Sequence, residues 1–185
     1  MNPETAATGA SQAWAEMVWQ QFGAAIDMFD NTLAACPDEL WTGRLWSVEE
    51  GPGIPPRFGE FWTIATHAIR WLERYLLVVA EDQFGSLETS TTLTPFPEDN
   101  EPQTKSTVRD CLAQLRERCR SRLMEVTDDQ AQRPITVYDW IGAITFLELQ
   151  LYNMRHVQEH AAQLALFLGQ HGVPDEKLDW VARAR

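Results

Sequence analysis

The sequence is poor in positive charge and in cysteine. It has 15 Lys and Arg against 27 Asp and Glu, which gives a formal net charge of −12 at pH 7. Phosphate binding needs a positive field, so this balance argues against a nucleic-acid partner. The three cysteines are an odd number that suits a reducing compartment. We expect Cys36, Cys111 and Cys119 to be small core residues.

Long apolar runs are also absent. The best candidate, residues 140–154, is interrupted by Glu148 and Asn153, so we expect no membrane-spanning helix and no membrane partner. Residues 1–12 have neither the charged start nor the apolar centre of a secretory signal. These absences favour a cytoplasmic protein.

No segment shows a convincing strand alternation. Apolar residues instead recur with a helical period in four segments, at about residues 11–35, 58–83, 104–126 and 136–170. The connectors 37–57 and 84–103 are rich in Gly and Pro and are too long for tight turns. We therefore predict an all-α fold, a four-helix bundle with long crossover connections.

The same patterns divide the chain into three parts. We expect a disordered leader over residues 1–10, a single bundle domain over residues 11–172, and a tail over residues 173–185 with a helical turn around Trp180. Thr104 can cap the third helix, and Thr136 to Asp139 has the form of a capping box at the start of the fourth, in which Gly142 is a candidate break. Gly172 is placed to end that fourth helix.

Histidine is scarce, and its placement is therefore informative. The sequence holds four, and three of them fall near the centres of the second and fourth helical segments. His156 and His160 are spaced i, i+4, so both rings project from one face of a helix. His67 by itself would more often be a core histidine bonded to a backbone carbonyl. His171 sits at a helix end beside Gly172 and is expected to be only a cap residue.

Three neutral imidazoles from two helices could converge on one divalent metal and leave coordination positions open. The pattern is not HExxH, because Glu159 directly precedes His160 instead of following His156. It is also not a ferritin-like di-iron site, which needs inward Glu from several helices. Spacing alone leaves a metal site and an ordinary core equally open.

The residues around these histidines resemble the DinB/YfiT-like metalloenzyme superfamily. The resemblance rests on FWTIAT directly before His67, on Leu40-Trp41 and Trp46-Ser47 in the preceding loop, and on the late H-x-x-x-H helix that continues into Gln163-Leu164. It implies a four-helix bundle in which His67, His156 and His160 hold a divalent metal. Relatives include thiol-dependent S-transferases and mycothiol-dependent maleylpyruvate isomerases. The isomerases have a Glu where His156 stands, so that particular activity is not expected here.

Side chains near the histidines in sequence are candidates for a substrate pocket or for supporting the ligands. Those within one helical turn or so of a ligand are Thr63, Trp71, Tyr152, Asn153 and Gln163. The loop residues Trp41 and Trp46 could wall a pocket, or could simply fold back over a core edge.

These observations favour a metal-dependent enzyme acting on a small molecule, with Zn, Ni, Fe or Mn as the ion. No carboxylate lies one turn from His156 or His160 on their face, so we expect transfer of a low-molecular-weight thiol to a small electrophile, not hydrolysis. A metal-dependent hydrolase is the first alternative. The second is a non-catalytic metal-stabilised binding or dimerisation module, and a homodimer is compatible with all three.

Overall fold

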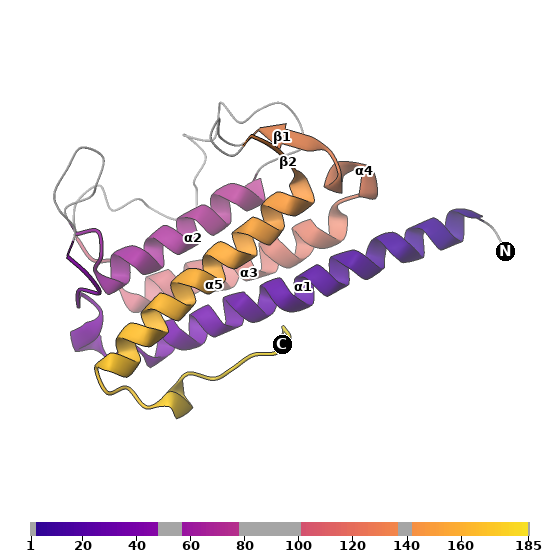
Figure 1. Cartoon of the computed structure of the whole chain (residues 1–185). Helices are drawn as coiled ribbons and strands as arrows, with labels where there is room; N and C mark the ends of the chain where they lie inside the picture. Colours follow the sequence, from indigo (N-terminus) through magenta and orange to yellow (C-terminus); the bar gives the residue numbers. More distant parts are fainter. Residues whose placement is uncertain (1–2, 48–56, 78–100, 137–141, 185) are drawn as a thin grey trace.

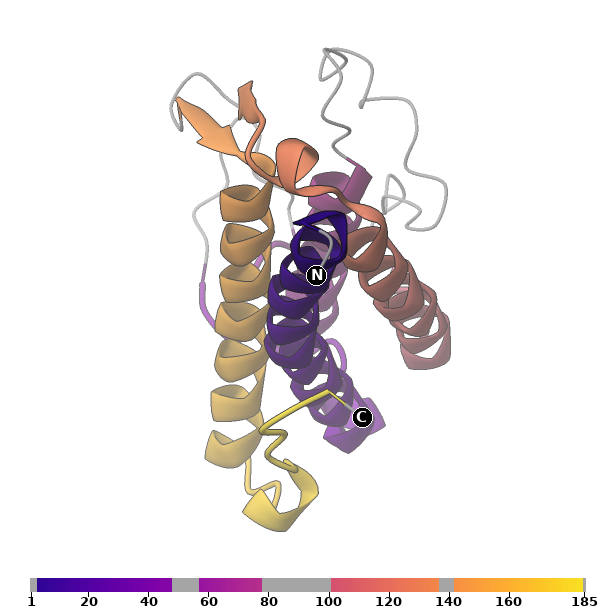
Figure 2. The same ribbon diagram turned by 90° about the vertical axis from the view of Figure 1, so that its right-hand side faces the viewer.

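Four long helices pack side by side with their axes roughly aligned (Figures 1 and 2). The computed structural model describes residues 3–47, 57–77, 101–136 and 142–184. The long helices are α1 (Pro3–Ala35), α2 (Phe61–Leu77), α3 (Lys105–Glu125) and α5 (Phe146–Gln170). The prediction of an all-α bundle is confirmed. Within the described residues, no helix combines the length and the apolar character needed to cross a membrane.

In cross-section, α1 and α2 lie at opposite corners of the bundle, because each of them packs against both α3 and α5. Figure 1 shows α1 and α5 running in one direction, and α2 and α3 in the other. Because α2 and α3 are parallel, the end of α2 and the start of α3 lie at opposite ends of the bundle. Most of the connector predicted between them, residues 84–103, lies outside the described part, as does the end predicted for the second helix.

The first helix is longer than predicted. It begins at Pro3, so residues 3–10 are helical where we expected a disordered leader. Ala6, Ala7 and Ala10 have the highest helix propensity of any residue type, which explains how the helical pattern extends backwards. Phe22, Phe29 and Leu33 of α1 are fully buried, and each contributes roughly 1.5–3 kcal/mol through removal of apolar surface from water.

The start of the last helix was predicted wrongly. Residues 134–136 form strand β1 (Pro134–Thr136), which pairs antiparallel with β2 (Ala143–Thr145), and α5 begins only at Phe146. The capping box belongs to Thr145 and Glu148, each side chain bonding the other residue's backbone N–H. β-branched residues and Gly142, with a φ of 74°, favour the ribbon over a continued helix.

The connector before the ribbon also contains a helical turn, α4 (Asp128–Ala131), capped by Thr127. The loop after α1 holds the short 3₁₀ helix η1 (Asp38–Leu40) and an isolated bridge between Arg44 and Glu60. Residues 48–56 of that predicted loop lie outside the described part.

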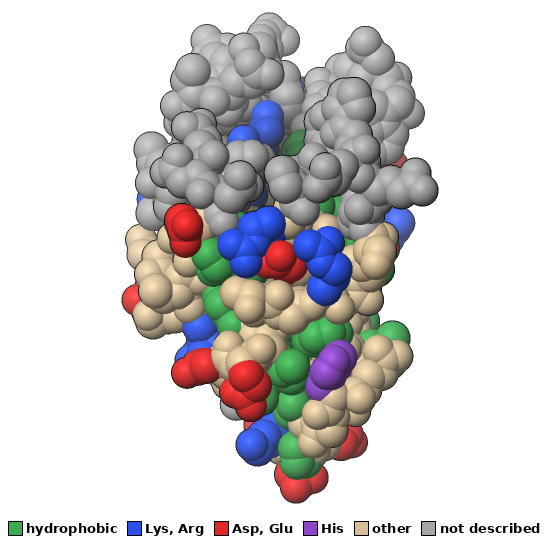
Figure 3. All heavy atoms as spheres, turned by 90° about the vertical axis from the view of Figure 1, so that its left-hand side faces the viewer, with side chains coloured by type: hydrophobic (Ala, Val, Ile, Leu, Met, Phe, Trp, Pro, Cys, Tyr) green, Lys and Arg blue, Asp and Glu red, His purple; other side chains and the backbone are tan. Residues whose placement is uncertain are grey.

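Helix α2 is the most deeply enclosed element, with twelve of its residues buried. Its first turn is fixed by Glu60, which is 7% exposed and accepts bonds from Arg44, Arg57 and the indole of Trp62. This end of the molecule faces the viewer in Figure 3, where acidic and basic side chains lie next to one another. The ion pairs fix the start of α2, and its buried residues pack it against α3 and α5.

The C-terminal residues fold back along α1. A 3₁₀ turn, η3 (Asp175–Lys177), takes the place of the predicted turn around Trp180, which is 82% exposed. The tail is held by hydrogen bonds from Asn31 and Gln21 to backbone carbonyls of Asp179 and Ala182, and from the backbone N–H of Ala184 to the carbonyl of Gln20.

Candidate metal centre

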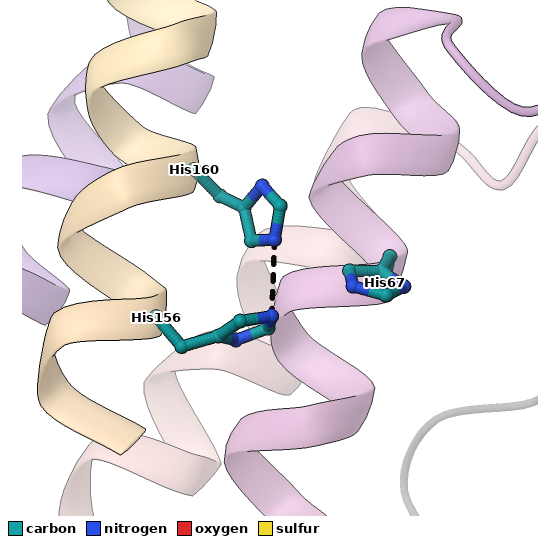
Figure 4. A group of neighbouring side chains, drawn as sticks. All are labelled: His67, His156 and His160. Carbon is teal, nitrogen blue, oxygen red and sulfur yellow. Dashed lines mark hydrogen bonds between the residues drawn. The ribbon is translucent and has the colours of Figure 1, made fainter. Parts of the chain in front are cut away.

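Three histidines meet between α2 and α5. His67 comes from α2, and His156 and His160 come from successive turns of α5 (Figure 4). One ring nitrogen from each residue lies within 4.8 Å of the other two. The ring centroids are 4.4 Å apart for the α5 pair, and His67 lies 5.3 Å from His156 and 5.0 Å from His160. The convergence predicted from the sequence is therefore present.

The helix geometry explains this convergence. Residues four apart on α5 project from one face, and that face packs against α2. On α2, His67 is half-buried between fully buried Ile64 and Ala68, so its ring emerges at the edge of the helix pair. The site is thus held by rigid elements, while partial exposure of all three rings leaves it open to small molecules.

Gln163 fixes the proton position on His160. Its side-chain oxygen Oε1 lies 2.8 Å from Nδ1 of His160. A carboxamide oxygen only accepts, so Nδ1 must carry the proton and Nε2 keeps its lone pair. Nε2 of His160 faces Nε2 of His156 at 3.0 Å, so both candidate donor atoms point to one place. The sequence-based proposal that Gln163 supports a ligand agrees with this contact.

The fold lowers the pKa of all three imidazoles and so favours their neutral form. Burial lowers the pKa of His67 to about 4 and that of His156 to about 3, and the positive charge that His160 would carry lowers both further. Burial also lowers the pKa of His160, against the opposite effects of its hydrogen bond to Gln163 and of the negative charge of Glu159. Only a neutral imidazole has a lone pair for a metal, so these shifts favour ligation.

Two buried polar atoms at the site have no hydrogen-bond partner in the described structure. They are Nδ1 of His156 and Oδ1 of Asn153, three residues apart on α5. While His156 donates from Nε2 to His160, its Nδ1 is a bare acceptor. A metal on Nε2 would require the proton to sit on Nδ1, which turns this atom from a bare acceptor into a donor.

The residues present therefore fit a divalent metal. Three neutral nitrogen donors converge, one is oriented by a second residue, and the present contact between two Nε2 atoms leaves a buried nitrogen without a partner. The donor set is all imidazole: within the described chain no Asp, Glu or Cys joins the cluster. Such a set suits Zn, Ni, Fe or Mn and leaves coordination positions open.

Aromatic side chains surround the histidines. Trp71 packs edge-on against His67 at 6.2 Å, Tyr152 stacks with His156 at 6.4 Å, and Tyr75 lies edge-on to His156 at 6.5 Å. The first two were predicted as site residues, and Tyr75 was not. Its position eight residues after His67, on the same face of α2, was the available signal.

Four other residues that were predicted at the pocket make contacts of a different kind. Trp41 is buried in the core against Phe61 and donates its indole N–H to the carbonyl of Gln103. Trp46 lies against the backbone of Gly59, whose φ of 99° permits the close approach. Among the described residues no ring contact joins either tryptophan to a histidine. The core-edge alternative therefore describes Trp41 correctly.

Thr63 and Asn153 are occupied by structural hydrogen bonds. The hydroxyl of Thr63 donates to backbone carbonyls of Arg57 and Glu60, which stabilises the first turn of α2. Asn153 is fully buried and donates to the carbonyl of Leu72, so it ties α5 to α2 and has no surface for a substrate. His171 is exposed at the end of α5, where its Nδ1 bonds the carbonyl of Phe167, as expected for a cap.

An antiparallel helix pair carrying three converging histidines within a four-helix bundle is an arrangement that could hold a metal ion. The family model of the DinB superfamily matches residues 21–164, and the chain belongs to that superfamily. This span includes all three histidines and Gln163. No curated protein and no solved structure matches the chain.

Proposed function

We propose that the protein is a divalent-metal-dependent S-transferase that joins a low-molecular-weight thiol to a small electrophile. The observation that carries this proposal is the donor set: three neutral imidazoles, with no carboxylate in the cluster among the described residues. Membership of the DinB superfamily supports a metal-dependent reaction at this position.

The absence of a carboxylate from the cluster favours thiol chemistry over hydrolysis. Activation of water usually needs a general base in the correct position to take its proton. A thiol has an unperturbed pKa of about 8.5, so it needs much less help than water. A divalent ion held by the three histidines would supply the positive charge that lowers a thiol pKa below neutral.

The protein's own residues hold and orient the reactants. His67, His156 and His160 would hold the ion, and Gln163 keeps Nε2 of His160 directed towards it. Trp71 and Tyr152 provide flat apolar surfaces beside the centre, on which an electrophile can pack. In the transfer, the thiolate sulfur forms a bond to an electrophilic carbon, the leaving group departs with its electron pair, and the thiol proton passes to solvent.

The test is a matched panel of reactions with the purified protein. The protein is stripped of metal, reloaded separately with Zn, Ni, Fe or Mn, and offered small thiols with a chloronitrobenzene electrophile. Conjugate should form only with metal and should be lost in His160→Ala but not in His171→Ala. If no thiol reacts while esters or lactones are hydrolysed by the same loaded protein, the hydrolase alternative replaces this proposal. If neither reaction occurs with any ion, the non-catalytic binding or dimerisation module is the better description.

A further inference from the structure

Two fully buried amide side chains of α5 bind the backbone of α2. Nε2 of Gln150 donates to the carbonyl of Tyr75 at 2.8 Å, and Nδ2 of Asn153 donates to the carbonyl of Leu72 at 3.3 Å. Nδ2 of Asn153 also lies 3.4 Å from Oε1 of Gln150, so the two amides bond each other. A backbone carbonyl has two lone pairs and can accept such a bond in addition to a helical one. Directional bonds are therefore added to the apolar packing between these two helices.

These bonds fix how the two helices are aligned along their length. From Leu72 to Tyr75 the chain moves three residues forward on α2, and from Asn153 to Gln150 it moves three residues back on α5. Each residue forward on α2 therefore comes level with one residue further back on α5. This correspondence is expected for two helices of equal rise that run in opposite directions (Figure 1).

The same alignment brings the histidines to one level. His67 is five residues before the carbonyl that Asn153 binds, so it comes level with the residue five after Asn153, which is position 158. This position is midway between His156 and His160. The ring of His67 is accordingly almost equally distant from both, with ring centroids 5.3 Å from His156 and 5.0 Å from His160 (Figure 4).

The two amides restrict the helices to a few alignments. Apolar contacts have no direction and would tolerate sliding, whereas carbonyls on one face of a helix recur once per turn, about every 5.4 Å. A smaller shift would leave the buried donors of Gln150 and Asn153 without acceptors, which is unfavourable. A shift by a whole turn would place His67 level with a point outside the α5 pair, and would separate donor nitrogens that now lie within 4.8 Å of one another.

Stability alone does not explain the presence of Asn153. Its Oδ1 is buried and has no hydrogen-bond partner in the described structure. An apolar side chain of similar volume would fill the same space without an unpaired acceptor. A buried polar side chain that lowers stability is a well-attested means of fixing the alignment of packed helices, as with a single Asn in a coiled coil.

We propose that Gln150 and Asn153 are positioning residues of the metal centre, which hold α2 and α5 in the alignment that brings His67 level with the midpoint of His156 and His160. Neither amide is a ligand, and both act through the position of His67. This inference rests on the metal binding of the proposed function, but it does not require the thiol reaction.

The metal-free protein provides the direct test. The double variant Gln150→Met/Asn153→Leu removes both amides and keeps about the same side-chain volume. NMR measures nuclear Overhauser effects between the ring protons of His67 and those of the two α5 histidines. These effects should be present in the wild type and lost in the double variant. Thr32→Val is the matched control and should keep them, because it removes a buried hydrogen bond, to the carbonyl of Met28, that lies within α1 and joins no two helices.

A thermodynamic cycle for Zn affinity separates alignment from general stability. The double variant should bind Zn at least about tenfold more weakly than the wild type, the usual effect of losing residues that orient a ligand. Adding His67→Ala to the double variant should weaken binding by no more than about twofold, within the error of additivity, because His67 already fails to reach the ion. In the wild-type background, His67→Ala should cause a much larger loss. Thr32→Val should leave Zn affinity unchanged.

Two outcomes would overturn the inference. One is a double variant that retains the Overhauser effects and the wild-type Zn affinity. The other is full additivity of His67→Ala with the double variant, which would mean that the amides do not act through His67. If the Overhauser effects are lost as expected but the wild type binds no metal ion, the alignment stands and the proposed function fails. Circular dichroism checks folding; if the double variant is unfolded, the same measurements on Gln150→Met and Asn153→Leu separately decide between these outcomes.

Discussion

The side-chain oxygen of Gln163 lies 2.8 Å from Nδ1 of His160. This contact determines which nitrogen of the ring is free, because an amide oxygen can only accept and so keeps the proton on Nδ1. The residue next to a ligand is in this case as informative as the ligand. The contact with Gln163 distinguishes a histidine whose donor atom is oriented from one that is merely half-buried.

Removing this contact should weaken metal binding without removing a ligand. Gln163→Ala is expected to reduce metal affinity about 10–100-fold, the usual effect of losing a residue that orients a ligating histidine. Competition against a chromophoric chelator measures the affinity. Gln158→Ala is the matched control, because Gln158 is an exposed amide on the same helix. Equal affinity in both variants would mean that Gln163 does not orient the ligand.

Each of the three histidines should be required for metal retention. His67→Ala, His156→Ala and His160→Ala should each lose most of the bound metal, because two imidazoles bind far more weakly than three. Elemental analysis after desalting gives the metal content. His171→Ala should retain full occupancy, since that ring is exposed and bonded to the backbone at the helix end. Full retention in any two of the three variants rules out the assignment.

The sequence was sufficient to predict the bundle and the meeting of the histidines. Both depend on helical periodicity, which is repeated over many residues, and on the i, i+4 spacing of His156 and His160. The start of the last helix was not predictable in the same way. Thr136 and Thr145 each precede an acidic residue by three positions, so the local pattern supports both as caps.

Tertiary contacts decide between these two starts. Pairing of β1 with β2 places Ile135 opposite Ile144, and both pack on the cluster formed by Tyr75 and Leu149. A helix beginning at residue 137 would forgo this burial, which no local rule takes into account. The position of Trp41 could likewise not be predicted from local sequence rules. A tryptophan in a Pro-rich loop is equally consistent with a core and with a pocket until its neighbours are known.

Acid should destabilise the metal-free protein through these histidines. The folded-state pKa is about 4 for His67 and about 3 for His156, below the ordinary value of 6.5, so between these values the unfolded chain binds more protons. Their contribution to stability is therefore complete above pH 6.5 and is lost as the pH falls towards 4. We expect the free energy of unfolding to fall by roughly 1–2 kcal/mol per histidine between pH 7 and pH 5.

Urea unfolding at pH 7, 6 and 5 measures this dependence, in a range above most carboxylate titration. The double variant His67→Ala/His156→Ala should show a flatter pH dependence than the wild type. A wild-type stability that stays constant over this range, or an equally steep loss in the double variant, would show that the two rings are not held neutral by the fold.

The C-terminal tail lies on α1 at Gly23. A Cβ atom at Gly23 would come within 2.5 Å of the Ala184 side chain and 3.0 Å of the Trp19 ring, whereas a Cβ at Gly169 of α5 would meet nothing within 4 Å. Glycine inside a helix costs about 0.5–1 kcal/mol relative to alanine, so its use on α1 is explained by the close approach of the tail. Gly169→Ala should therefore stabilise the protein and leave the tail in place. Gly23→Ala should raise the free energy of unfolding less or not at all, because it must displace either residues 182–184 or the buried Trp19.

Hydrogen exchange at the Ala184 amide, which donates to the carbonyl of Gln20, reports directly on tail docking. Exchange should be faster in Gly23→Ala than in Gly169→Ala, and unchanged protection in both would mean that the tail does not require the glycine.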